Sequence, residues 1–418
     1  MFTRAIFLLA AIALAAAVGL AQPQADQTIQ VGLFYGSRAP ETLVISGTGG
    51  AQGERGKGAF EGDVKVAAEG GEIVLEHKRG RVIAGRWVEF APTGRDLWLE
   101  LAKAAYRGKL RVEVGKAGRL TVVNTLALED YVRGVVPNEM FAHLSAYKVQ
   151  ALVSRTYAIY VRDSERKHRL DGFDICATGH CQVYRGVDSE TPLSDEAVEA
   201  TRGQVLTYQG KPIFSAYHSN AGGMTQTVDE AWPGSIRENF PYLCKVDSPF
   251  DAEAEVLPGF AWCYRWQCDV TPKDIADRLR ARGKDVGAVR DLRVRSRTST
   301  GRVRELEVVG STGREMLRSQ NDLRAVLVTP SDRMDIEKGE NCFKVTGWGC
   351  GHGVGLSQHV ALGMAKAGYE YDQILGHFYR GVDLTEDYGR GPSRPLSPPE
   401  VKLAAPDARP TPSPPGAG

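Results

Sequence analysis

The sequence lacks an excess of charge of either sign. Its 418 residues include 52 lysines and arginines and 51 aspartates and glutamates, which gives a formal net charge of +1. Proteins that bind nucleic acid commonly carry a marked positive charge on one face. The balanced charge therefore gives no support for a dedicated nucleic-acid-binding protein.

Long apolar runs are also scarce. One lies near the N-terminus, and no second candidate membrane span follows it. Arg4 precedes the apolar residues 5–20, and the small residues Gly19 and Ala21 offer a cleavage site before Gln22. This pattern is typical of a secretory signal peptide over residues 1–21, with an uncleaved anchor helix as the alternative. We therefore expect an extracytoplasmic protein (secreted, periplasmic or associated with the cell wall) with no membrane span after signal cleavage.

Nucleotide-binding fingerprints are absent as well. Glycines alternate with other residues over 347–355, but the stretch lacks the Gly-Lys-Ser/Thr ending of a P-loop and the glycine spacing of a dinucleotide site. Such alternation prevents a compact side-chain surface and brings backbone N–H groups forward.

We expect a helix over 357–367 that stops at Gly368 and a second helix that starts at Asp372, with Ile374, Leu375 and Phe378 facing inward.

The chain divides by pattern into a strand-rich region, a mixed region and a tail. Alternating apolar residues and glycine-rich turns predict strands within residues 28–118. Residues 119–390 mix helical and strand patterns and form a second expected domain, which carries the motifs described below. Residues 391–418 are rich in proline and alanine, which predicts a disordered tail or linker. Together these patterns predict an α+β protein.

Seven cysteines are present, an odd number, so at least one thiol is left unpaired within a monomer. Cys176, His180 and Cys181 are close enough in sequence to share one zinc ion, with His168 as a fourth ligand. A Cys176–Cys181 disulfide and free thiols are the alternatives, and no cofactor is expected to be required for activity. In an oxidising compartment we further expect Cys350 to pair with Cys342, and Cys263 to pair with Cys268 or Cys244.

A single acid stands out in the stretch at residues 128–162. We expect a strand through Glu129, then a tight Gly/Pro turn that presents Glu139, then a buried helix capped by Ser145. Apolar neighbours at 137, 140 and 141 disfavour the charged form of a carboxyl, which is how a glutamate becomes a general acid near neutral pH. Taken without further context, a lone glutamate beside a helix is more often a capping or surface group.

These residues resemble the SpoIID/LytB family of bacterial sporulation and cell-wall proteins. LEDYVRGVVPNEM matches the family core almost residue for residue, and SAYKVQALVSRTYAIY matches it more loosely. A second match is GCGHGVGLSQ, residues 349–358, in which Cys350 stands where the family usually has an aromatic residue; His359, just after it, is another such departure. Weaker matches occur at residues 174–186 and 216–226.

The resemblance implies a SpoIID-type catalytic domain and a peptidoglycan lytic transglycosylase that cleaves the MurNAc–GlcNAc bond without water, with Glu139 as catalytic acid/base. It also implies a set of substrate-binding residues around the groove: Arg155, Gln182, Tyr184, His218, Ser219, Gly222, Gly223, His352, Gly353, Ser357 and Gln358. The expected partners are peptidoglycan glycan strands and a cell-wall amidase or another wall hydrolase. One alternative is a non-catalytic wall-binding enhancer of an amidase. Another is a cysteine hydrolase that uses Cys350 with His352, although adjacency in a flexible glycine turn disfavours the nucleophile–base hydrogen bond.

Overall fold

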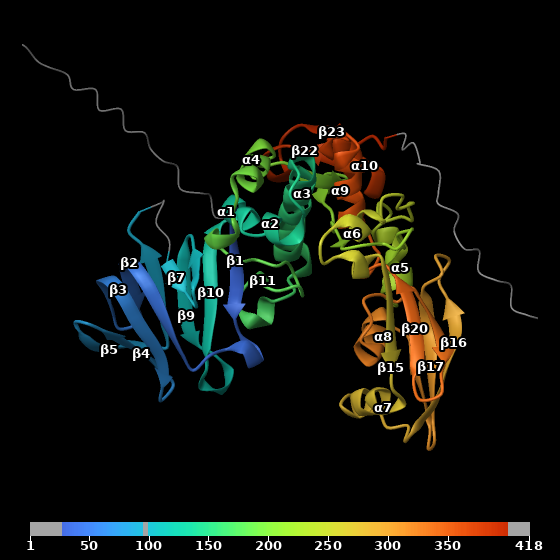
Figure 1. Cartoon of the computed structure of the whole chain (residues 1–418). Helices are drawn as coiled ribbons and strands as arrows, with labels where there is room; N and C mark the ends of the chain where they lie inside the picture. The colour runs from blue at the N-terminus through green and yellow to red at the C-terminus, as the bar shows by residue number, and fades with distance from the viewer. Residues whose placement is uncertain (1–26, 95–98, 400–418) are drawn as a thin grey trace, which may run out of the picture.

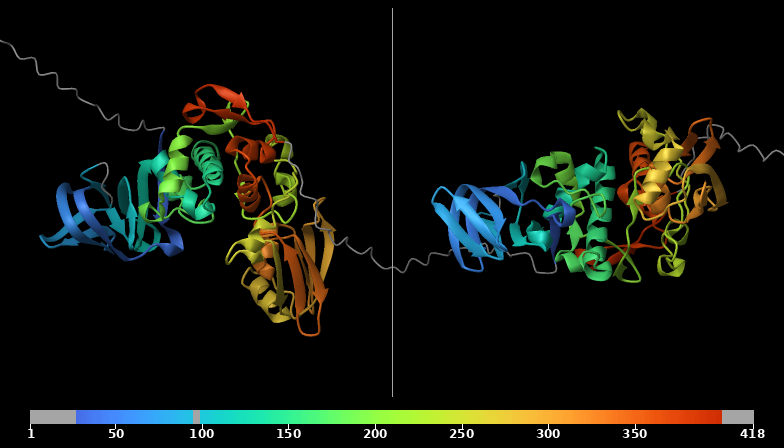
Figure 2. Two further views of the ribbon diagram at one scale, coloured as in Figure 1. Left: turned by 45° about the horizontal axis from the view of Figure 1, so that its top comes forward. Right: turned by 90° about the horizontal axis from the view of Figure 1, so that it is seen from below.

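The computed structural model describes residues 27–94 and 99–399 as an arch (Figure 1). A sheet-rich part forms one leg, helices form the top, and a second strand-rich part forms the other leg; the two further views show the same three parts (Figure 2). Helices and strands are mixed, as the sequence predicts. The predicted signal peptide, residues 1–21, and the end of the predicted tail, residues 400–418, lie outside the described residues.

The first leg is an eleven-stranded sheet with the order β11-β1-β10-β9-β6-β2-β3-β4-β5, to which β7 and β8 attach beside β2. Alternating apolar residues explain its burial pattern, because successive side chains of a strand point to opposite faces. Its strands are β1 (Thr28–Phe34), β2 (Thr42–Gly53), β3 (Gly56–Glu69), β4 (Glu72–His77), β5 (Gly80–Gly85), β6 (Trp87–Pro92), β7 (Leu99–Leu101), β8 (Ala104–Tyr106), β9 (Lys109–Val114), β10 (Leu120–Ala127) and β11 (Ile175–Cys176). The sheet thus includes strands from beyond residue 118.

Two short helices replace the predicted turn before Glu139. β10 ends at Ala127, and α1 (Leu128–Arg133) and α2 (Val136–Glu139) follow, so Glu129 lies in a helix and not in a strand. Pro137 is in the first turn of α2, where its missing N–H is not needed. The predicted cap Ser145 is also wrong, since α3 (Leu144–Tyr160) begins after His143 and carries Ser145 inside it.

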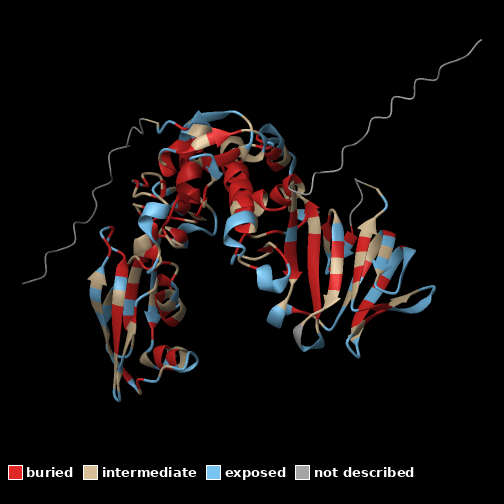
Figure 3. Ribbon diagram, turned by 180° about the vertical axis from the view of Figure 1, so that it is seen from behind, coloured by how far each residue is buried: buried red, intermediate tan, exposed pale blue. Residues whose placement is uncertain are grey.

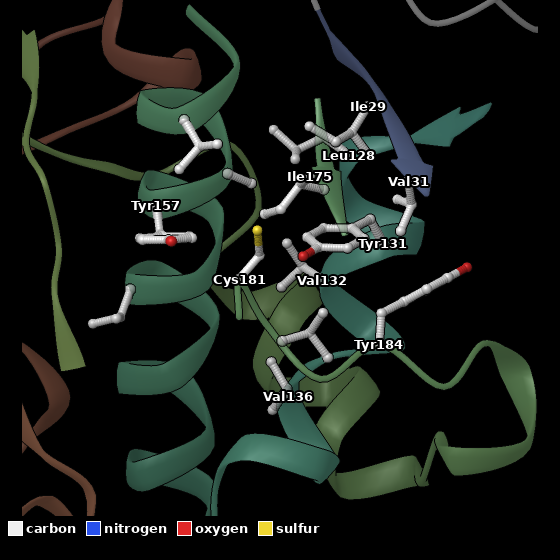
Figure 4. Close-up of a cluster of buried hydrophobic side chains, with 14 of the residues drawn as sticks. Ile29, Val31, Leu128, Tyr131, Val132, Val136, Tyr157, Ile175, Cys181 and Tyr184 are labelled. Atoms are coloured by element: carbon white, nitrogen blue, oxygen red, sulfur yellow. The ribbon is translucent and has the colours of Figure 1, made fainter. Parts of the chain in front are cut away.

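Helix α3 is the centre of the molecule. It packs against α1, α2, α4 (Pro192–Ala200), α9 (Gln358–Lys366) and α10 (Tyr371–Phe378). Its ribbon is almost entirely buried (Figure 3). In Figure 4, Tyr131, Val132 and Val136 of the α1–α2 segment face Tyr157 of α3, and Cys181 lies between them.

The remaining elements around α3 are short. The predicted helix stop at Gly368 is confirmed, because this glycine follows α9 with φ at +87°. Ile374, Leu375 and Phe378 of α10 are fully buried, as predicted. The short elements are β12 (Val205–Tyr208), β13 (Lys211–Pro212), β14 (Tyr217–His218), α5 (Val228–Ala231), α6 (Glu253–Val256), β21 (Leu356–Ser357), β22 (Asp383–Thr385) and β23 (Ser393–Pro395). β23 pairs with β22 and Leu396 is buried, so the prediction of a disordered tail from residue 391 is wrong for residues 391–396.

The second leg has its own hydrophobic core. Trp266, Ile275, Leu306, Leu323 and Val345 are among its buried residues. The leg is built from β15 (Arg265–Val270), α7 (Pro272–Arg280), β16 (Val289–Arg297), β17 (Val303–Gly310), β18 (Arg314–Leu317), α8 (Gln320–Leu327), β19 (Met334–Lys338) and β20 (Phe343–Trp348). We call this unit, residues 265–348, the second lobe.

Candidate active site

Glu139 lies at the C-terminal end of α2, where three distant segments meet its carboxylate. Its Oε1 accepts a hydrogen bond of 2.5 Å from the backbone N–H of Val183. The side chains of Tyr217 and Gln358 also donate to the carboxylate. Gln358 additionally donates to the backbone carbonyl of Glu139. The acid is therefore held in place by residues far apart in the sequence.

Burial raises the pKa of Glu139 above the ordinary range of a glutamate. The hydrogen bonds from Val183, Tyr217 and Gln358 favour the charged form and lower the pKa, but burial outweighs them. The side chain is not sealed off, because Glu139 keeps part of its surface exposed. A half-buried carboxyl with a raised pKa can hold a proton and still reach a ligand.

A chain of hydrogen bonds leads away from Glu139 into the core. The hydroxyl of Tyr131 donates to Oε1 of Gln182 at 3.0 Å, and Nε2 of Gln182 donates to the hydroxyl oxygen of Tyr217 at 3.3 Å. Tyr217 therefore has its own hydrogen free for the carboxylate of Glu139. Burial also raises the pKa of Tyr217, so the phenol stays a donor. No motif in the sequence singled out Tyr217, although it directly precedes His218.

Aromatic rings form the other side of the site. Phe141, two residues after Glu139, lies 4.9 Å from the rings of both Phe260 and His359, centroid to centroid. The Nδ1 of His359 is 2.7 Å from the carbonyl oxygen of Ser219. Phe260 is 37% exposed, so this cluster presents an apolar edge to solvent. Such an edge beside a half-buried acid can receive the apolar face of a ligand.

Asp251 ties the glycine-rich segments together beneath this edge. Its carboxylate accepts hydrogen bonds from the backbone N–H groups of Ala221 and Gly223 and from the hydroxyl of Ser357. Burial raises the pKa of Asp251 to about 6. No motif in the sequence pointed to this residue, because its partners come together only in the fold.

The two histidines of the predicted site are neutral supports. Nδ1 of His352 accepts from the backbone N–H of Val354 at 3.0 Å, and His352 also bonds to the backbone of Tyr217. Burial lowers the pKa of His352 to about 3 and lowers that of His218 as well. The rings lie 5.3 Å apart. His352 therefore supports the strand that carries Tyr217 and does not offer a cation near neutral pH.

Several predicted substrate-binding residues lie away from solvent. Arg155 has no exposed side-chain surface and forms a bidentate ion pair with Glu129, with N–O distances of 2.7 and 2.6 Å. Tyr184 is buried under Gly134 and donates to Asn124 at 2.9 Å. A buried side chain whose polar atoms are satisfied cannot contact a polymer without rearrangement. These positions therefore support structural roles for Arg155 and Tyr184.

The predicted glycines serve close backbone packing. Gly222 and Gly223 have φ of +70° and +114°, which glycine adopts without strain. A Cβ on Gly222 would lie 2.9 Å from the backbone of Gly349, and one on Gly353 would lie 2.5 Å from the guanidinium of Arg302.

Of the predicted residues, the structure brings Gln182 and Gln358 to Glu139, Ser219 to His359, and His352 behind Tyr217; Ser357 bonds to Asp251.

The cysteine loop brings four potential metal ligands together. One ligand atom each from His168, Cys176, His180 and Cys181 lies within 4.8 Å of all the others. The distance between sulfur and nitrogen ligands on a tetrahedral zinc is about 3.5 Å, and the measured Sγ–N distances of 3.4, 3.6 and 3.7 Å fit it. Nδ1 of His168 also bonds to Asp171 at 2.9 Å, as the outer nitrogen of a zinc-bound histidine does. The residues present therefore fit a tetrahedral zinc ion.

The other predicted cysteine pairs do not match the structure. The thiol of Cys350 contacts that of Cys263, and not that of Cys342. Cys268 lies opposite Val345 in the β15–β20 register, so it is not placed against Cys263. The cysteine-hydrolase alternative also loses support, because His352 bonds to Val354 and Tyr217 and because burial and Cys263 raise the pKa of Cys350. A thiol with a raised pKa is a poor nucleophile.

Within residues 27–94 and 99–399, no helix is both long and apolar enough to cross a membrane. What the described part of the chain shows is an α+β protein that carries a half-buried acid, Glu139, between a helix end and a glycine-rich loop.

Two family models match parts of the chain. Residues 116–208 match the family model described as stage II sporulation protein, and residues 223–355 match a domain of unknown function, DUF8618. The chain is 30% identical over 278 residues to stage II sporulation protein D of Bacillus subtilis, which covers 63% of this chain and 76% of that protein. It is also 30% identical over 277 residues to an uncharacterized protein of Brachyspira hyodysenteriae, covering 65% of this chain and 70% of that protein.

A further relative carries a different name. The amidase enhancer of Bacillus subtilis is 28% identical over 303 residues, covering 61% of this chain and 40% of that protein. The chain belongs to the SpoIID/LytB family.

Proposed function

We propose that this protein acts on the bacterial cell wall as a lytic transglycosylase, which cleaves the MurNAc–GlcNAc bond of peptidoglycan to leave 1,6-anhydroMurNAc ends. The observation that carries this proposal is the environment of Glu139, an acid with a raised pKa and three donors aimed at its carboxylate. We also infer an extracytoplasmic location, in line with the substrate and with the apolar run at residues 5–20.

Glu139 would serve as acid and then as base. Protonated, it donates its hydrogen to the glycosidic oxygen as that bond breaks. The carboxylate left behind is stabilised by the Val183 N–H and the Tyr217 hydroxyl, and it then removes the proton of the MurNAc C6 hydroxyl for attack on C1. Such proton transfer contributes about 10²- to 10⁴-fold in rate. The rest depends on correct placement of the C6 hydroxyl.

The partners of Glu139 support a mechanism that uses a single acid. A glycoside hydrolase ordinarily uses two carboxylates that flank the bond. Three of the other acids of the matching motifs have partners elsewhere: Glu129 pairs with Arg155, Asp174 accepts from the N–H of Gln30, and Glu230 pairs with Lys245. The partners of Glu139 are a backbone amide, a phenol and a carboxamide. The substrate's own hydroxyl is then the economical nucleophile.

We further propose that zinc has a structural role in the cysteine loop. His168, Cys176, His180 and Cys181 would use all four positions of a tetrahedral ion, which leaves no position for a substrate. Val183, which donates to Glu139, lies two residues after Cys181. Zinc would therefore hold the loop that supplies this donor.

The amidase-enhancer relative favours a second candidate, a wall-binding protein without turnover that stimulates a separate amidase. Glu139→Gln separates the two. The amide keeps an acceptor for the Val183 N–H but cannot transfer a proton, so we expect an unchanged melting temperature and a loss of glycan turnover of about 100-fold or more. Glu196→Gln, on the exposed face of α4, is the matched control and should keep full activity.

Both variants should be assayed on purified glycan strands, alone and with a cell-wall amidase, by mass spectrometry of the products. More than about a tenth of the wild-type rate in Glu139→Gln, against the expected loss of a proton-transfer step, would move the acid elsewhere. No turnover by the wild type, together with equal amidase stimulation by wild type and Glu139→Gln, would favour the enhancer.

A further inference from the structure

The chain enters and leaves the second lobe through two paired strands, which we call the neck of the lobe. β15 enters the lobe and β20 leaves it, and the two pair antiparallel with Arg265 opposite Trp348. The ladder continues toward the main body, because the N–H of Gly349 donates to the carbonyl of Tyr264 at 2.9 Å. The ladder ends there, because Ala261–Cys263 form a 3₁₀ helix, and Cys263 and Cys350 are the next residues beyond the bonded pair Tyr264 and Gly349.

The side chains of these two cysteines approach each other. The thiols of Cys263 and Cys350 are in hydrogen-bond contact, and the hydroxyl of Ser219 is 3.7 Å from the sulfur of Cys263. Cys263 is 1% exposed. The backbone of Cys350 is fixed by two hydrogen bonds with Asn220, at 2.8 and 3.0 Å. Two cysteines held with their thiols in contact need little movement to be joined.

Cys263 also ends a segment that borders the candidate active site. We call residues 251–263 the strap. Its first end is tied by Asp251 to the backbone N–H groups of Ala221 and Gly223. Three residues before its second end, Phe260 packs edge to face on Phe141, two residues from Glu139. A bond at Cys263 would anchor the second end of the strap.

We propose that Cys263 and Cys350 form a disulfide, which closes the neck of the second lobe and anchors the strap beside the candidate active site. During folding, the thiolate of one cysteine attacks an external protein or small-molecule disulfide and releases one external thiol. The second thiolate then attacks the mixed disulfide, forms the Cys263–Cys350 bond and releases the other external thiol. Two protons leave the cysteines, and the external disulfide takes up their two electrons.

The remaining cysteines provide the contrast. Cys268 lies on β15 opposite Val345, and Cys342 precedes β20 three residues from that position. The disulfide closes a loop of 86 intervening residues that contains the whole second lobe, and a cross-link over so long a loop restricts the unfolded chain strongly. We therefore expect it to contribute to stability independently of any activity.

The test is peptide mapping of the full-length protein exported to an oxidising compartment. Free thiols are blocked by alkylation under denaturing, non-reducing conditions, and the digest is analysed by mass spectrometry. We expect a cross-linked pair of peptides containing Cys263 and Cys350 that disappears on reduction, with Cys268 and Cys342 alkylated. Alkylated Cys263 and Cys350, or a cross-link of either to another cysteine, would overturn the proposal.

Melting measurements with and without a phosphine reductant test the role in stability. Wild type should lose about 5 °C on reduction. Cys263→Ser and Cys350→Ser should melt at the lower temperature with or without reductant, and the control Cys268→Ser should respond as the wild type does. An equal response in Cys263→Ser and wild type would show that reduction acts elsewhere and would contradict the proposed anchor.

An activity arm rests on the proposed function. If the strap needs its second anchor, reduction should lower glycan turnover in wild type and in Cys268→Ser by the same factor, and should have no effect on Cys263→Ser. A wild type that carries the cross-link but shows no turnover in either state would contradict the proposed function and leave the disulfide established. Turnover by a wild type that lacks the cross-link would contradict the disulfide and leave the proposed function supported.

Discussion

At the scale of single residues, Glu139 combines two opposing effects on one carboxyl. Burial raises its pKa, whereas Val183, Tyr217 and Gln358 stabilise the carboxylate. An acid that must first give and later accept a proton needs both influences, because its two forms should be close in free energy near the working pH. The apolar neighbours of Glu139 in the sequence predicted the first effect. The second depends on residues 44 to 219 positions away, which no local pattern reveals.

The balance at Glu139 predicts the pH profile of turnover. The first step needs the protonated acid, so kcat should fall as pH rises through the raised pKa of Glu139. Tyr217→Phe removes a donor to the carboxylate, which raises this pKa further. We expect the alkaline limb of the profile to move to higher pH and kcat at its maximum to fall.

The control for this measurement is Tyr371→Phe, whose tyrosine begins α10 and lies over Lys148, away from the carboxylate. Its profile should match the wild type. An alkaline limb that stays in place in Tyr217→Phe would mean that the phenol does not act on the acid.

Arg155 illustrates how a motif residue can serve the fold. Replacing it with methionine leaves the buried Glu129 without its partner, and breaking a buried ion pair in this way costs about 3–5 kcal/mol. We therefore expect Arg155→Met to lower the melting temperature markedly while the folded protein binds glycan as the wild type does. Calorimetry and glycan pull-down measure the two effects. Arg237→Met, at an exposed position, should change neither, and weaker glycan binding by folded Arg155→Met would restore the predicted substrate contact.

At the scale of elements, the sequence predicted regular periodic segments well and irregular ones poorly. The buried helix at α3 and the two C-terminal helices follow from periodicity, and Gly368 ends the first of these two. The strand through Glu129 was wrong, because α1 and α2 are too short to show a helical period. β23 was missed because its proline-rich sequence pairs with β22 only through contacts that bury Leu396.

The cysteine loop gives a prediction at this scale. If it holds zinc, elemental analysis should find about one zinc per chain in protein made without added metal. Cys181→Ser should lose the metal and melt at a lower temperature. Cys244→Ser should keep it, because Cys244 lies outside the four-ligand cluster.

Thiol counting under denaturing, non-reducing conditions separates the alternatives for the same loop. Metal-free protein in which Cys176 and Cys181 are blocked would establish the disulfide instead. Metal-free protein with both thiols reactive would exclude zinc and disulfide together, and packing alone would then hold the loop.

At the scale of the whole molecule, the active-site region is the meeting point of segments from residue 139 to residue 358. The helical top of the arch carries Glu139 (Figure 1). In the sequence, the strap precedes the second lobe and the glycine-rich loop follows it. Sequence patterns predicted the strand-rich first region and the mixed class. They did not reveal that residues 265–348 have a separate core, because the strands of that lobe resemble any surface strands until β15 and β20 pair.

The proposed function requires that one acid, Glu139, cleaves glycan strands without water. Digestion of purified glycan in oxygen-18 water, followed by mass spectrometry of the new MurNAc ends, tests it most directly. We expect ends that are unlabelled, lighter by one water than hydrolysis products and resistant to borohydride reduction. Ends that carry oxygen-18 and are reducible would contradict it, because they would show a hydrolase with a second carboxylate at the site.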